Sequence, residues 1–317
     1  MKLITNEFYI KLNFKYKAYI QNVFSSVPQG ERFNYFFQKH ITHSLPISDV
    51  EFSEKIETVK LHYNNFKKYC GDKNPKSCKY YEFGSGFDMV IPIGISLIGF
   101  GNLTCIDIRE LVFPDLINDS IKRFYGFKDK FGEKVKVLKD IPSVDRKNYR
   151  EILWEYFNIK YIAPLDARKT GIENNSIDFI LSNATMEHIP GNDLPDIMKE
   201  CFRILKPGGV MSNVIDYRDH WSFFDNSISV YNYLIYSDSE WNKLNPSIMY
   251  QNRMRHSDYI KIINDSGFEI LEEKPDFPNE KELDQLKKIK LADHYLRNYT
   301  TEELSIKSCM LVLRKNP

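Results

Sequence analysis

The sequence predicts an α/β protein with a doubly wound, largely parallel sheet and a helical N-terminal extension. From Lys79 onward, short apolar segments alternate with helical patterns, as they do where crossover helices connect parallel strands. Before that point, apolar residues recur at helical spacing, as Phe52, Ile56 and Val59 do. We therefore divide the chain into a helical extension over residues 1–70 and an α/β domain over residues 71–317.

Seven segments have the length and apolar character of buried strands. They are Lys79–Phe83, Leu103–Ile108, Ile159–Ala163, Ile177–Ser182, Gly209–Ile215, Phe268–Glu272 and Ile306–Leu313. Helical patterns occupy Met89–Ile98 and Leu194–Leu205, and another begins near Ser257. Seven strands are enough for one large sheet.

Two insertions interrupt the alternation. The first, at about 112–158, is far longer than the dozen or so residues that a compact crossover needs. Within it, residues 121–150 hold ten Lys or Arg against four Asp or Glu, which indicates either a solvated basic face or a patch that meets a phosphorylated or acidic substrate. The second, at about 217–256, is rich in aromatic residues and follows the fifth strand, at the edge where open α/β sheets bind ligands.

Charge and composition exclude two broad classes. The 317 residues carry 44 Lys or Arg and 43 Asp or Glu, a net charge of +1, so no overall field attracts a nucleic acid. The longest nearly apolar run, Met89–Phe100, is too short to cross a bilayer. The N-terminus lacks the uninterrupted apolar core of a secretory signal, and the five cysteines form no CxxC pair. We expect a cytoplasmic protein with reduced thiols.

A glycine turn at the end of the first strand is the strongest functional signal. Gly84 and Gly86 can adopt backbone angles closed to other residues and let a ligand approach the main chain, while the following helix presents free N–H groups. Asp107 closes the second strand, where a carboxylate can accept hydrogen bonds from both hydroxyls of a ribose. Turn and acid together predict a nucleoside-containing cofactor.

The identity of that cofactor depends on the residues around the turn. The dinucleotide fingerprint would need glycine at position 89, where this chain has Met89, so a dinucleotide dehydrogenase remains only a remote third option. An acid two residues before the first glycine suits another ligand. Here the chain resembles the class I S-adenosylmethionine-dependent methyltransferases, of the methyltransferase-11-like kind. Glu82, Gly84, Gly86 and Asp107 match the first two motifs of that family.

The resemblance extends over about residues 79–216. Asp166 in Pro164–Ala167 takes the position of the acid that meets the adenine amino group, and the segment from Ser176 through Asn183 to His188 resembles the fourth strand and the loop beside the methionine moiety. The family implies a Rossmann-like sheet of seven strands with an antiparallel last strand, and S-adenosyl-L-methionine as cofactor. The implied cofactor residues are Glu82, Gly84, Ser85, Gly86, Asp107, Asp166, Ala167, Asn183 and His188.

One residue departs from the family pattern. Asp88 stands where a third glycine is frequent, so it either alters the start of the first helix or caps it. Glu82–Asp88, Asp219–Trp221 and Asn252–Arg255 together are also similar to uncharacterised methyltransferases of bacterial surface-polysaccharide synthesis. This similarity implies a saccharide acceptor.

Methyl transfer needs an aligned acceptor and, for a hydroxyl, removal of its proton. His220 is the candidate base, because its segment leaves the fifth strand at the ligand-binding edge, Asp219 or Asp216 could orient it, and imidazole titrates near neutrality. The alternative is a surface or packing histidine. Arg253 and Arg255 could grip a phosphate or carboxylate, or be surface arginines, and Trp221 is a further substrate candidate.

The function predicted is methyl transfer to a hydroxyl of a saccharide or nucleotide-linked sugar, so the expected partner is a small-molecule or glycan substrate. Two alternatives stay open: an N-methyltransferase of a small metabolite or amino sugar, and a catalytically silent cofactor-binding subunit. No metal site is assigned, although Asp216, Asp219 and His220 could gather a divalent ion. Assembly into a homo-oligomer is also left open.

Overall fold

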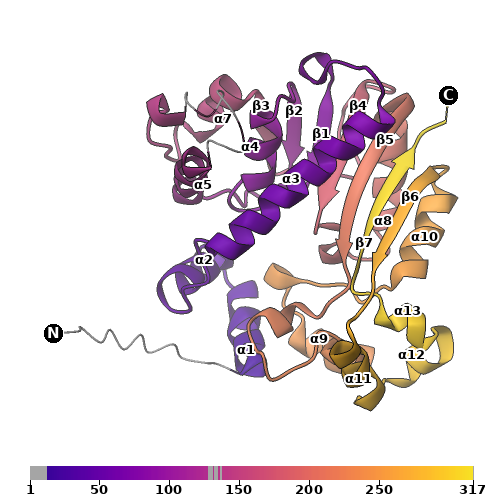
Figure 1. Ribbon diagram of the computed structural model, residues 1–317. Coiled ribbons are helices and arrows are strands. Elements are labelled where there is room, and N and C mark those ends of the chain that lie inside the picture. Colours follow the sequence, from indigo (N-terminus) through magenta and orange to yellow (C-terminus); the bar gives the residue numbers. More distant parts are fainter. Residues whose placement is uncertain (1–12, 128–130, 132–134, 136–137, 317) are drawn as a thin grey trace. The chain divides into compact units, whose positions relative to one another are not determined.

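The computed structural model describes residues 13–127, 131, 135 and 138–316, which form two compact units (Figure 1). The sheet unit comprises Asp49–Tyr217, Met254–Asp276 and the chain from Ser308 onward. The helical unit combines the described residues up to Ser48 with Arg218–Arg253 and Phe277–Lys307. Each unit is therefore assembled from three separate stretches of sequence.

The sheet unit contains one seven-stranded sheet in the order β3-β2-β1-β4-β5-β7-β6. Its strands are β1 (Tyr80–Phe83), β2 (Leu103–Ile106), β3 (Ile159–Ile162), β4 (Ile177–Asn183), β5 (Leu205–Asp216), β6 (Glu269–Asp276) and β7 (Ser308–Arg314). The pairings from β3 through to β5 are parallel, whereas β7 runs antiparallel to both β5 and β6. All seven predicted strands and the antiparallel last strand are confirmed.

The predicted fifth strand begins earlier than expected. We expected the strand to begin at Gly209, but β5 already starts at Leu205 and pairs with β4 both before and after the segment 206–209. The ladder accommodates the segment by a register shift between Ile177 and Phe179, and Gly208 has a φ of 75°. The glycines therefore appear as an irregularity inside a strand.

Helices cover both faces of the sheet. The α-helices of this unit are α3 (Asp49–Tyr69), α4 (Val90–Leu97), α5 (Pro114–Gly126), α7 (Tyr149–Phe157), α8 (Leu194–Ile204) and α10 (His256–Asp265), and the 3-10 turns are η1 (Pro75–Ser77) and η3 (Met186–His188). Figure 1 shows α3 lying across the sheet. Phe66 of α3 contacts Tyr80 and Phe179, with ring centroids 5.7 and 5.5 Å apart. Three aromatic rings therefore anchor α3 to the centre of the sheet.

The basic stretch at 121–150 is described only in part, because residues 128–130, 132–134 and 136–137 lie outside the described chain. Two of its arginines form ion pairs within the sheet unit. Arg123 meets Asp49 at 3.1 Å and Asp119 at 2.8 Å, and Arg150 meets Glu110 at 3.5 Å. At these two positions the charge is balanced by neighbouring carboxylates.

The helical unit has an aromatic core of its own. Its α-helices are α1 (Phe14–Ser25), α2 (Gly30–His40), α9 (Asp238–Leu244), α11 (Glu280–Lys288), α12 (Asp293–Asn298) and α13 (Thr301–Ser305), and its 3-10 turns are η4 (His220–Phe223), η5 (Asn232–Ile235) and η6 (Ser247–Met249). Phe14, Trp221, Tyr231, Trp241 and Tyr295 are buried in one cluster. The backbone N–H of Phe14 donates to Asp225 at 3.1 Å, across 211 positions of sequence. Distant segments thus cooperate in this core.

Across the described residues, no helix combines the length and the apolar character that crossing a membrane requires.

Candidate active site

The glycine turn follows β1 in the conformation that its sequence predicts. Gly84 and Gly86 have φ angles of 76° and 78°, in the left-handed region that favours glycine. A Cβ on Gly84 would lie 2.2 Å from a methyl group of Thr185, so this glycine permits close packing. A Cβ on Gly86 would meet no atom within 4 Å, so the backbone there faces open space. The second glycine therefore leaves room for a ligand against the main chain.

Asp88 caps the helix that follows the turn. One carboxylate oxygen accepts from the Val90 N–H at 3.1 Å, and the other accepts from Lys55 at 2.7 Å. Met89 has a φ of 56° and links the turn to the first residue of α4. The capping interpretation of Asp88 is thus confirmed, since its side chain takes up a donor that the helix terminus would leave unsatisfied.

Asp107 lies beside the glycine turn, one residue beyond β2. Its carboxylate accepts from the Tyr161 hydroxyl at 2.9 Å and faces the backbone N–H groups of Ser85 and Gly86. The residue is 3% exposed, and burial raises its pKa to about 7, although Tyr161 and the two backbone N–H groups oppose the rise. The structure therefore brings the predicted ribose acid and the predicted turn into direct contact.

Glu82 is the second buried acid of this region. It is on β1, and burial, followed by the charge of Asp107, raises its pKa well above the usual range. The Cys105 thiol donates to it at 3.7 Å. Burial therefore raises the pKa of both neighbouring carboxyls at this edge of the sheet.

Asp166 is placed differently from the other cofactor candidates. Its side chain is partly exposed, and both oxygens accept from Arg168 at 2.6–3.1 Å. Arg168 lowers the pKa of this carboxyl and also meets Asp193 at 2.6 Å. Asp166 and the adjoining Ala167 follow β3, so a ligand that binds Asp166 must share the carboxylate with Arg168.

The loops after β4 and β5 meet at the same edge of the sheet. Asn183 is the last residue of β4, and the hydroxyl of Thr185 lies 3.2 Å from the Gly84 carbonyl oxygen. His188 ends the short η3 turn and is exposed. Its neighbour Glu187 accepts from the backbone N–H of Asp216, the last residue of β5, at 3.3 Å. The ends of β1, β4 and β5 are therefore fastened together.

Arg255 is fully buried in the sheet unit, so it is not a surface arginine. Its guanidinium donates to the Tyr217 carbonyl at 2.9 Å and lies 5.5 Å from the centre of the Tyr217 ring. Its backbone N–H donates to Asp258, which closes the first turn of α10. These contacts fix the chain just beyond β5 to the start of α10.

Four of the predicted site residues, His220, Asp219, Trp221 and Arg253, belong to the helical unit. The Asp219 carboxylate accepts from the Trp221 N–H at 2.8 Å and from Asn232 at 2.9 Å, and burial raises its pKa to about 6. His220 stacks on Phe223 with ring centroids 5.1 Å apart. Trp221 is buried in the aromatic core. Asp219 therefore supports the turn that carries His220.

Arg253 is held inside the helical unit by backbone carbonyls. Its guanidinium donates to the carbonyl oxygens of Tyr233 at 3.1 Å and Tyr236 at 2.6 Å, and it pairs with Asp238. It also lies 5.6 Å from the ring centres of both Trp241 and Tyr295. This environment is that of a structural arginine in an aromatic core.

Two residues beside Asp107 were not singled out from the sequence. Ile108 directly follows Asp107 and is 57% exposed, although it is a large apolar residue. Tyr161 bonds to Asp107, but nothing in the sequence separates it from an ordinary strand tyrosine. The apolar residue directly after Asp107 could have been recognised from the sequence. The contact of Tyr161 with Asp107 can be recognised only when the register between β2 and β3 is known.

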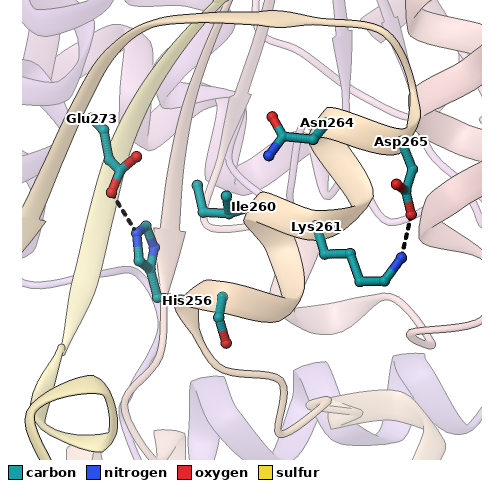
Figure 2. Close-up of a pocket in the computed structure, with 7 residues that line it drawn as sticks. His256, Ile260, Lys261, Asn264, Asp265 and Glu273 are labelled. Atoms are coloured by element: carbon teal, nitrogen blue, oxygen red, sulfur yellow. Dashed lines mark hydrogen bonds and ion pairs between the residues drawn. The ribbon is translucent and has the colours of Figure 1, made fainter.

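A separate shallow pocket lies between α10 and β6 in the sheet unit (Figure 2). His256 bonds to Glu273 at 2.9 Å on this surface and to the Tyr217 hydroxyl at 3.1 Å on its inner side. None of the predicted site residues lines this pocket.

Comparison with known proteins indicates which reaction the sheet unit could catalyse. A family described as "Methyltransferase domain" matches residues 143–212, which include α7, β3, β4, α8 and part of β5. At these residues the chain is similar to a methyltransferase domain. The residues of the sheet edge fit S-adenosylmethionine as the cofactor, because the open space beside Gly86 adjoins a buried carboxylate that can accept hydrogen bonds from ribose hydroxyls. No curated protein sequence matches this chain.

Several solved structures resemble this chain at low sequence identity. A candidate sarcosine dimethylglycine methyltransferase from Galdieria sulphuraria is 15% identical with a TM-score of 0.46, over 82% of this chain and 86% of that one. Geranyl diphosphate C-methyltransferase from Streptomyces coelicolor is 10% identical with a TM-score of 0.45, over 86% of each chain. Phosphoethanolamine N-methyltransferase 2 from Haemonchus contortus is 14% identical with a TM-score of 0.45, over 92% of this chain and 61% of that one. At these levels of sequence identity, the substrates of these proteins cannot be assigned to this chain.

Proposed function

We propose that this protein transfers the methyl group of S-adenosylmethionine to a hydroxyl of a saccharide or nucleotide-linked sugar. The assignment of the cofactor rests on one observation: Asp107 faces the backbone amides of the glycine turn, beside the open space at Gly86. The choice of acceptor rests on His220, four residues after the end of β5, and on the similarity of its segment to uncharacterised methyltransferases of bacterial surface-polysaccharide synthesis.

In the proposed complex, Asp107 accepts hydrogen bonds from the ribose hydroxyls and the glycine turn lies along the cofactor. Glu82 and Ser85 support the turn, Asp166 and Ala167 lie toward the adenine, and Asn183 and His188 lie toward the methionine moiety. The exposed side chain of Ile108 packs against the adenine ring, because burying apolar surface there is favourable. Each assignment concerns residues within the sheet unit.

The cofactor supplies an electrophilic methyl group on a positively charged sulfur. The acceptor oxygen forms the new carbon–oxygen bond as the carbon–sulfur bond breaks, and S-adenosylhomocysteine leaves without the charge. We assign the proton of the acceptor hydroxyl to the imidazole of His220, with Asp219 supporting its turn. Arg253, Arg255 and Trp221 then act by holding the surrounding chain, which is the role that their buried contacts favour.

The test is a methyl-transfer assay with isotopically labelled cofactor and a panel of nucleotide sugars and oligosaccharides. His220→Ala should lower turnover by roughly 100-fold or more with unchanged affinity for S-adenosylhomocysteine, since general-base catalysis typically supplies that much. Gly86→Val should abolish cofactor binding, because a branched side chain both strains the left-handed backbone and fills the open space. His40→Ala, an exposed histidine of the helical unit, is the matched control.

Three outcomes would contradict parts of the proposal. Normal turnover of the His220 variant removes the base and favours methylation of nitrogen or a reaction driven by alignment alone. Label found on an amine of the product assigns an N-methyltransferase. Tight binding of S-adenosylhomocysteine without transfer to any acceptor in fractionated cell-envelope intermediates favours a silent cofactor-binding subunit.

A further inference from the structure

We propose that Tyr161 is a positioning residue of the cofactor site: its hydroxyl holds the Asp107 carboxylate in place for the ribose. The inference rests on the proposed role of Asp107. Tyr161 donates to the Oδ2 atom of Asp107 at 2.9 Å, and both residues are buried. It is the side-chain donor that the structure gives to this carboxylate, beside the backbone amides of the glycine turn.

The register of the sheet explains why Tyr161 reaches this position. Glu82 of β1 pairs with Cys105 of β2, and Cys105 pairs with Tyr161 of β3. Residues directly opposite one another in parallel strands present their side chains on the same face. A carboxyl, a thiol and a phenol therefore form one row across the sheet, and Asp107 lies two residues after Cys105, just beyond the end of β2. The row ends at the phenol.

The hydroxyl of Tyr161 is itself fixed. The backbone N–H of Leu111, in the loop that follows Asp107, faces this oxygen and lowers its pKa against the effect of burial. The ring of Tyr161 meets the ring of Tyr149 at 6.2 Å in an edge-to-face arrangement. Burial and the neighbouring Asp107 raise the pKa of Tyr161 far above its usual range, so the hydroxyl remains a donor throughout the range of a binding experiment.

A fixed donor matters because the carboxylate must serve several partners at once. A carboxylate offers about four lone-pair sites. Two are directed at the turn by Ser85 and Gly86, so the orientation of Oδ2 decides whether a ribose hydroxyl finds an acceptor. The titratable or charged groups that face Asp107 are Glu82 from β1, Arg109 from the following loop and Tyr161 from β3. Among these, Tyr161 and Arg109 favour the ionised carboxylate, whereas burial disfavours it.

The experiment measures the affinity of purified full-length protein for S-adenosylhomocysteine by calorimetry between pH 6 and pH 8.5. Tyr161→Phe keeps the ring and removes only the hydroxyl. At pH 7 we expect the variant to bind S-adenosylhomocysteine about three- to five-fold more weakly than wild type. Without the hydroxyl, the pKa of Asp107 is higher, so the variant needs a higher pH to ionise this carboxyl. The difference in affinity between variant and wild type should therefore become smaller as the pH rises. Tyr149→Phe is the control, since it loses a bond to Glu110 and leaves Asp107 untouched.

A second variant distinguishes positioning from packing. In an Asp107→Ala background, Tyr161→Phe should cause no further loss of affinity, whereas a packing role would weaken binding again. Wild-type affinity of Tyr161→Phe at every pH, or a loss that is constant across pH and repeats in the Asp107→Ala background, would overturn the inference. A wild-type protein that binds no S-adenosylhomocysteine would instead refute the proposed function.

Discussion

At the scale of single residues, burial controls the chemistry of the ionisable side chains in the sheet unit. Asp107 and Glu82 are kept from solvent at the edge of the sheet, and their pKa values rise for that reason. His62 lies deeper, between α3 and β5, where its Nδ1 atom meets the Ser212 hydroxyl at 2.9 Å. Burial lowers the pKa of His62 to about 4, so the folded protein holds this ring neutral.

His62 therefore predicts a loss of stability in acid. Its folded pKa is depressed from 6.5 to about 4, so the unfolded chain binds the proton more tightly. The stabilisation is complete above about pH 6.5 and is lost as pH falls toward 4, amounting to about 3 kcal/mol. Urea unfolding at stepwise pH should show this slope for wild type, and a shallower one for His62→Gln, which cannot titrate. Equal slopes would remove His62 from the acid response.

At the scale of elements, the close approach of α3 and α4 depends on one glycine. A Cβ on Gly94 of α4 would lie 2.6 Å from a methyl group of Val59 and 3.2 Å from the ring of Phe124. Val59 is fully buried on α3, and its branched side chain is stiff in a helix. The glycine is thus required by packing rather than by backbone angle, and it sets how closely α4 lies against the helix that crosses the sheet.

Gly94→Ala should destabilise the protein by about 1–3 kcal/mol, because overpacking outweighs the better helix propensity of alanine. Gly126→Ala is the matched control, since a Cβ there meets no atom within 4 Å. Adding Val59→Ala to Gly94→Ala should recover part of the loss, so the double variant is less unstable than the sum of the two single changes. Additive losses in urea unfolding would refute the contact.

At the scale of the whole molecule, the chain is divided into two units, each made from three segments. The aromatic core and Arg253 hold the helical unit together, while the sheet and its helices form a second core. Units with separate cores can open separately, because local unfolding follows contiguous packing. Damage to one unit should therefore stay within it.

Arg253→Met tests this separation by hydrogen exchange. Loss of the bonds to the Tyr233 and Tyr236 carbonyls should speed exchange in peptides from residues 13–48, 218–253 and 277–307. Exchange in β1, β4 and β5 should match wild type. Arg32→Met, an exposed arginine of the same unit, should change neither set. Faster exchange in the strands as well would show that the units unfold together.

What the sequence could predict follows from the range over which each signal acts. The strands, the glycine turn and Asp107 depend on neighbours close in sequence, so they were predictable. The surroundings of Arg253 were not, because its partners Tyr236 and Tyr295 come from different segments. Tyr161 likewise becomes meaningful only once β2 and β3 are paired in register. The role of a residue cannot be predicted from the local sequence pattern when tertiary packing determines that role.

The hydrogen bond between Phe14 and Asp225 has a consequence for synthesis on the ribosome. The two residues are separated by 211 positions, so at roughly 5–20 residues per second the partner of Phe14 follows it by roughly 10–40 seconds. During that interval α1 has neither this acceptor nor the core contributed by residues 277–307. Its apolar side chains stay exposed until these partners have been synthesised. A nascent chain with exposed aromatic residues is the form that chaperones bind. Helix α1 is therefore synthesised long before the segments that it packs against.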